Sequence, residues 1–87
     1  MADVHLPTTL MPLFTGLPRR LDLDAPTVGE AIGQLNERWP GLQDRLCEPG
    51  PAIRMHIHVY VNGERAWLDT PIPERSRVDV IAAISGG

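Results

Sequence analysis

Apolar and polar residues alternate strictly along residues 55–61, a pattern that predicts a β-strand with one buried face. The isoleucine and the two valines of this segment share the face that we expect to meet a core, and its two histidines and its tyrosine share the other face. Asn62-Gly63 follows directly, and this dipeptide is the strongest short-range signal for a tight hairpin turn. We therefore expect a hairpin in which a short strand over residues 64–67 pairs with the first strand.

Three other segments have the composition of strands. Residues 4–7 alternate briefly, and residues 19–24 alternate polar and apolar positions, so the two predict a hairpin with an irregular connection. Residues 77–84 are β-branched and apolar on both sides of the predicted strand. Because a strand that is buried on both faces lies inside a sheet, we expect this last strand in a central position beside the first one.

The clearest helix signal begins at Thr27, with Glu30 three residues later in the arrangement of a capping box. Apolar residues then recur at helical spacing and define one buried stripe: Val28, Ala31, Ile32, Leu35 and Trp39. Pro40-Gly41 ends the helix, because proline lacks the amide hydrogen that the helical ladder needs.

The order of elements is strand, strand, helix, strand, short strand, strand, with a further helical turn over residues 42–46 and a loop over residues 48–51. One helix packed across a mixed sheet buries one face of each. The sequence therefore predicts an α+β roll in which a mixed sheet of four to five strands carries one main helix. Its 87 residues are enough for a single domain over residues 1–87.

Composition and charge exclude several classes of function. The chain is 43% hydrophobic and 22% charged, which is typical of a globular protein. No apolar stretch approaches the ~20 residues of a membrane span, and no secretory signal is visible, so we expect no membrane partner and a cytoplasmic location. With a net charge of −3 and scattered arginines, nucleic acid is not an expected partner. A single cysteine excludes an internal disulfide and a zinc site made of four cysteines.

The side chains that could carry chemistry of their own are few. His56 and His58 share one strand face, His5 is a possible neighbour, and two such imidazoles can bind a metal ion. No carboxylate or cysteine accompanies them in the sequence, so we expect an exposed sheet face and predict no metal site. Cys47 lacks an obvious base and is interpreted as a packing residue.

The sequence ends in Ser85-Gly86-Gly87, directly after the predicted central strand. Two glycines without a Cβ can enter a cleft that any other residue would fill. The alternative is that they form an ordinary frayed end. The residues alone leave both interpretations open.

The order of elements and the terminal glycines together resemble the ubiquitin-like β-grasp sulfur carriers of the ThiS/MoaD type, which serve thiamine, molybdopterin and cysteine synthesis. The resemblance covers essentially the whole chain and is closest to the MoaD-like branch that includes a carrier for cysteine biosynthesis. The segments that carry it, besides the helix that begins at Thr27, are Leu6-Pro7-Thr8 with Pro12, Thr15-Gly16, Asp44-Arg45-Leu46, Val59-Tyr60-Val61-Asn62 and Gly86-Gly87.

The resemblance implies a protein co-substrate rather than an enzyme. An adenylating and sulfur-transferring enzyme of the MoeB/ThiF type would use ATP and a sulfur source to convert Gly87 to a thiocarboxylate, and a biosynthetic enzyme would accept the sulfur. Ser85, Gly86 and Gly87 would form a flexible tail that threads the partner's cleft. The carrier itself would have no catalytic residue and no stably bound cofactor.

The resemblance also implies a docking surface, for which Ile81, Ala83 and Arg65 are the candidates; burial in the core is the alternative for Ile81. Two other functions remain open on the same scaffold. One is a ubiquitin-like modifier that is conjugated to lysines through Gly87, and the other is a plain binding module. The pathway that receives the sulfur (cysteine, molybdopterin, thiamine or a sulfur-containing natural product) is also open.

Overall fold

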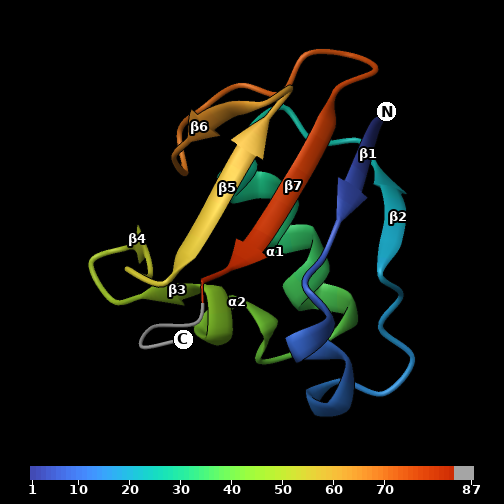
Figure 1. The fold of residues 1–87 in the computed structure, drawn as a ribbon, viewed down its shortest axis with the longest axis vertical. Coiled ribbons are helices and arrows are strands. Elements are labelled where there is room, and N and C mark those ends of the chain that lie inside the picture. Colours follow the sequence, from blue (N-terminus) through green and yellow to red (C-terminus); the bar gives the residue numbers. More distant parts are fainter. Residues whose placement is uncertain (84–87) are drawn as a thin grey trace.

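The computed structural model describes residues 1–83 (Figure 1). Its elements, in chain order, are β1 (Ala2–His5), the 3-10 helix η1 (Thr8–Leu13), β2 (Arg20–Leu23), α1 (Val28–Arg38), α2 (Leu42–Leu46), β3 (Cys47–Glu48), β4 (Ala52–Ile53), β5 (Ile57–Val61), β6 (Glu64–Ala66) and β7 (Arg77–Ala82). None of the helices within residues 1–83 has the length and apolar character to cross a membrane.

The main sheet has five strands in the order β2-β1-β7-β5-β6. The last strand, β7, lies at its centre, parallel to β1 and antiparallel to β5 (Figure 1). The last strand in the sequence is thus held on both sides by strands that precede it in the chain. The central position confirms the prediction, and the mixed five-stranded sheet confirms the expected architecture. The expected burial of both faces is wrong, because only Val78 and Val80 of β7 are buried, whereas Arg77 and Ile81 on the opposite face are exposed.

Helix α1 packs across one face of the sheet and begins where the sequence predicts. The Thr27 hydroxyl accepts a hydrogen bond from the Glu30 amide at 3.2 Å and so satisfies one of the open amides of the first turn. The apolar stripe faces the sheet, with Val28 and Leu35 at most 2% exposed. Trp39 caps the other end, half-buried, and its indole donates to the Thr15 carbonyl at 3.2 Å.

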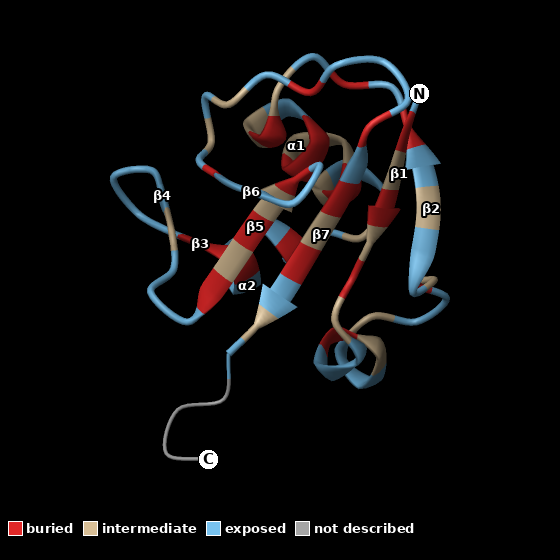
Figure 2. Cartoon of the chain, turned by 45° about the horizontal axis from the view of Figure 1, so that its top comes forward, coloured by how far each residue is buried: buried red, intermediate tan, exposed pale blue. Residues whose placement is uncertain are grey.

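The core lies between α1 and the inner face of the sheet. Buried residues alternate with intermediate ones along β5 and with intermediate or exposed ones along β7, as the colours of Figure 2 show. Val4, Val78, Val80 and Val59 face inward on the three central strands. The short helix α2 closes one end of the core with two fully buried leucines, Leu42 and Leu46.

The observed elements differ from the expected ones at several boundaries. The strand expected from residue 55 begins at Ile57, because Met55 and His56 form a turn in which the Ile57 amide donates to the Arg54 carbonyl at 2.9 Å, so His56 does not share a strand face with His58.

The first strand begins at Ala2 and ends at His5. The Leu6 amide still donates to the Arg19 carbonyl at 2.7 Å, in register with β2, but Pro7 has no amide hydrogen with which to continue the ladder. The loop expected over residues 48–51 is the turn of a small hairpin, in which Cys47 pairs with Ile53. Strands of two residues are too short for a periodic signal.

Candidate functional site

The face of the sheet opposite α1 carries the candidate docking residues. Ile81 lies on β7 opposite His58 of β5 and is 47% exposed, whereas its neighbour Val80 is 6% exposed on the inner face. Of the two alternatives for Ile81, the structure therefore places it on the surface. An exposed isoleucine on a central strand is available for contact with a partner.

Ala83 follows β7 and is the last described residue. It is exposed, and its amide donates to the His56 carbonyl at 2.7 Å. The chain therefore leaves the sheet from a position that is fixed against the start of β5. The predicted tail residues Ser85, Gly86 and Gly87 lie outside the described residues.

Arg65 and Trp67 extend this surface toward the edge strand β6. Arg65 is exposed opposite Tyr60, and its guanidinium lies 4.7 Å from the centre of the Trp67 ring, a cation–π contact. The indole is 55% exposed at the end of β6 rather than buried in the core. Because Ala66 pairs with Val59, Trp67 follows on the row of His58. We call Ile81, Ala83, Arg65 and Trp67 the exit surface.

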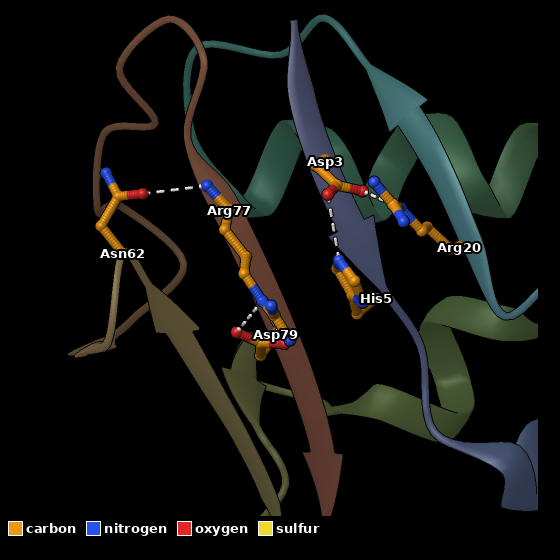
Figure 3. Close-up of polar contacts among 6 residues, drawn as sticks. All are labelled: Asp3, His5, Arg20, Asn62, Arg77 and Asp79. Atoms are coloured by element: carbon orange, nitrogen blue, oxygen red, sulfur yellow. Dashed lines mark hydrogen bonds and ion pairs between the residues drawn. The ribbon is translucent and has the colours of Figure 1, made fainter.

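The other half of this face carries charges that neutralise one another (Figure 3). Arg20 donates from Nε to Asp3 at 2.8 Å, and His5 Nε2 lies 3.1 Å from the same carboxylate. Arg77 contacts both oxygens of Asp79, at 3.1 and 3.0 Å. The Arg20 guanidinium, and to a smaller extent His5, hold the pKa of Asp3 below its usual value. The exit surface is therefore bordered by paired charges.

Asn62 has a second role that the sequence does not reveal. Its φ of 52° and the 84° of Gly63 form the predicted hairpin turn. In addition, its side-chain carbonyl accepts from the Arg77 amide at 2.9 Å (Figure 3). Its amide group donates to the Ser76 hydroxyl at 3.1 Å. The turn thus holds the start of β7, and only the fold brings these residues together.

The remaining candidates do not assemble into a site of their own. His5 pairs with Asp79 and His58 with Ile81, so the histidines of β1 and β5 lie on different rows of the sheet. Within residues 1–83, no three metal-ligating side chains come close enough together to hold a metal ion. Cys47 is 7% exposed, and burial raises the pKa of its thiol. A buried thiol of raised pKa is a poor nucleophile, which fits the packing role predicted for it.

Comparison with known proteins identifies the family. The model of the ThiS family matches residues 4–87. The chain belongs to the ThiS family. A relative in Mycobacterium tuberculosis, the sulfur carrier protein CysO, is 30% identical over 90 residues, which cover 97% of this chain and 96% of that protein.

Solved structures of ThiS-like proteins have the same β-grasp fold. The CysO of the Amycolatopsis orientalis BexX/CysO complex is similar with a TM-score of 0.87, 26% identity and 100% coverage of both chains. Mycobacterium tuberculosis CysO gives a TM-score of 0.83 at 27% identity, over 97% of this chain and 100% of that one. Small archaeal modifier protein 1 of Haloferax volcanii gives 0.72 at 27% identity, over 95% and 97% of the two chains.

Proposed function

We propose that this ThiS-family chain is a sulfur carrier whose Gly87 carboxylate is converted to a thiocarboxylate. The observation that carries the proposal is the family match, which runs through the last residue of the chain and so includes both terminal glycines. The relatives named as sulfur carrier proteins, at 30% identity over nearly the whole chain, support the same function. On this proposal the chain is a co-substrate, and its partners perform the catalysis.

The chemistry requires activation because a carboxylate is a poor acyl donor. Its oxygen attacks the α-phosphate of ATP, pyrophosphate leaves, and Gly87 becomes an acyl-adenylate. Hydrosulfide then attacks the carbonyl carbon, AMP leaves with the bonding electrons, and the thiocarboxylate forms with loss of one proton. If the donor is an enzyme persulfide, a second thiol cleaves the resulting S–S bond and ends in a disulfide with the first. We place these ATP-dependent steps in the cytoplasm.

The partners on this proposal are an activating enzyme of the MoeB/ThiF type and a biosynthetic enzyme that accepts the sulfur. The Amycolatopsis CysO in complex with BexX is a related carrier seated on a partner protein. In this chain, the exposed Ile81 and Ala83 stand at the end of the central strand, and Arg65 lies over Trp67 on the same face. We propose that the exit surface meets the partner while Ser85, Gly86 and Gly87 enter its cleft.

The test is intact-protein mass spectrometry after incubation with ATP, sulfide and an activating enzyme of this type. The expected product is heavier by the exchange of one oxygen for sulfur. A chain without Gly86 and Gly87 is the matched control, which we expect to fold normally and to stay unmodified. If the full chain gains neither AMP nor sulfur with activating enzymes from ThiS-family pathways, the proposal fails.

A second function is favoured by one observation, the likeness to small archaeal modifier protein 1. A modifier undergoes the same activation, but the acyl group ends on a lysine of another protein. The discriminating measurement is a search for Gly87 in isopeptide linkage after expression in a host that contains the activating enzyme. A plain binding module is the remaining alternative, and it would keep its partners after removal of the two glycines.

A further inference from the structure

The central strand β7 is covered by β1 along only half of its length. β1 pairs with Arg77, Val78 and Asp79, whereas β5 pairs with β7 as far as Ala82. After His5 the chain bends away from β7 toward η1 (Figure 3). The C-terminal half of β7, residues 80–82, therefore has a strand on one side and, within residues 1–83, none on the other.

The direction of the backbone groups shows which of them are left without a partner. Arg77 accepts from Asn62 at 2.8 Å, and Ala83 donates to His56 at 2.7 Å, so the odd-numbered residues of β7 face β5. Alternate residues of a strand bond to opposite neighbours. Val80 and Ala82 therefore face the uncovered side. Leu6 cannot bond to the Val80 or Ala82 backbone because its amide already donates to the Arg19 carbonyl, and Pro7 has no amide hydrogen.

A groove of about 430 Å³ opens where β1 ends, between His5 and Leu6 and the start of the uncovered part of β7 at Val80. Its lining includes Val80, three arginines (Arg19, Arg20 and Arg77) and one aspartate, Asp79. Arg20 and Arg77 are paired with Asp3 and Asp79, whereas no carboxylate within residues 1–83 lies within 4.0 Å of Arg19. The groove is thus basic on a chain of net charge −3. A local excess of positive charge favours and orients an acidic partner.

We propose that an extended, acidic segment of the partner enzyme adds to β7 in this groove as a β-strand. The segment would bond to the Val80 carbonyl and the Ala82 amide, which are the groups that β1 leaves open, and its carboxylates would face Arg19. This inference rests on the proposed function for the identity of the partner. It adds a main-chain contact beside the exit surface, so the partner would hold β7 from its edge as well as from its face.

The test uses the full chain labelled with nitrogen-15 and a probe peptide of alternating glutamate and valine, acetylated and amidated at its ends. We expect the peptide to shift the amide resonance of Ala82 and to slow its hydrogen exchange. A peptide with glutamine in place of glutamate should bind less tightly. If inorganic phosphate moves the same resonances as strongly as the peptide, the groove is a simple anion site and strand addition is wrong. Absence of any shift with the glutamate peptide also overturns it.

Two pairs of variants separate the charge from the main-chain contact. Arg19→Glu should weaken peptide binding by about fivefold, while Arg45→Glu, an exposed arginine outside this groove, should leave it unchanged. Ala82→Pro removes the open amide and should abolish binding, while Ala82→Gly keeps that amide and should retain it. Each variant is first checked for a native spectrum. Equal effects within either pair would overturn the proposal.

This assay contains no ATP and no activating enzyme, so its outcome is independent of the proposed chemistry. A chain that gains sulfur normally but does not bind the peptide would overturn strand addition alone. A chain that binds the peptide but is never adenylated would overturn the proposed function instead.

Discussion

Asp3 shows how a single residue organises the charged half of the outer sheet face. It lies on β1 between Asp22 of β2 and Arg77 of β7, and it contacts both Arg20 and His5. Opposite charges across neighbouring strands stabilise a sheet, and like charges destabilise it. Arg20 and His5 thus compensate for the carboxylate of Asp22 beside Asp3. The sequence did not predict which of these side chains pair, because Asp3 lay outside the first strand expected over residues 4–7.

The pKa of Asp3 makes its contribution to stability depend on pH. Because Arg20 and His5 hold the pKa of Asp3 in the folded state below its usual value, the ionised form stabilises the fold at pH values above that usual pKa. The contribution is lost as the pH falls through the lowered value. We expect Asp3→Asn to lower the free energy of unfolding at neutral pH. In acid, the difference in free energy of unfolding between the variant and the wild type should become smaller. Urea unfolding at a series of pH values measures it.

Asp22→Asn is the matched control for that series. Asp22 is exposed on β2 opposite Asp3, and no ion pair joins it to another side chain within residues 1–83. Removing its charge should leave stability at neutral pH equal or slightly higher, because one like-charge neighbour of Asp3 is gone. If the stability difference between Asp3→Asn and the wild type does not change with pH, ionisation of Asp3 does not stabilise the fold.

At the scale of elements, α1 was predictable because its signals are local. The cap, the apolar stripe and the proline that follows all lie within one stretch of the chain. The small β3–β4 hairpin and the early end of β1 were not predictable in this way. The first depends on pairs of only two residues. The second depends on how far β1 runs beside β7, a contact between segments that lie apart in the sequence.

Two glycines of α1 provide a test of how tightly this helix packs. Apart from its chain neighbours and the backbone of its own helix, a Cβ at Gly33 would meet no atom within 4 Å, whereas one at Gly29 would lie 3.0 Å from the Leu68 carbonyl oxygen. Gly33→Ala should therefore stabilise the protein by about 0.5–1 kcal/mol through helix propensity alone. Gly29→Ala gains the same propensity but displaces the carbonyl that accepts the Gly29 amide at 2.8 Å. We expect it to be less stable than Gly33→Ala.

Thermal and urea unfolding of the two single variants measure this difference. The comparison is internal, since both substitutions add one methyl group to the same helix. Equal stabilisation by both would mean that the segment after β6 moves freely away from α1. That result would contradict the packing of Gly29 against Leu68.

At the scale of the whole molecule, β7 serves the core with one face and the candidate docking surface with the other. Val80 is 6% exposed and Ile81 is 47% exposed, although they are adjacent. Val80→Ala should lower the free energy of unfolding by about 1–3 kcal/mol and leave sulfur loading intact while the protein is folded. Ile81→Arg should change stability by less than about 1 kcal/mol and slow loading.

The measurements are urea unfolding and the rate of mass gain with the activating enzyme at a fixed carrier concentration. The pair of variants separates folding from docking, because each should affect one measurement and spare the other. If Ile81→Arg loads as fast as the wild type, Ile81 lies outside the docking surface. If Val80→Ala slows loading at a temperature where it is folded, the two faces are not independent.

The sequence by itself determined the local elements and their order. Periodicity, capping and the Asn-Gly turn act between residues a few positions apart, so they predicted α1 and the β5–β6 hairpin. The apolar composition of the last strand predicted its central place. The terminal glycines and the order of elements pointed to the family that the comparison shows. Only the tertiary structure shows the features that depend on how distant strands meet in the sheet. Ile81 is exposed, Asn62 holds the start of β7, and β1 leaves the C-terminal half of β7 uncovered. These contacts join distant segments, and no local pattern encodes their register.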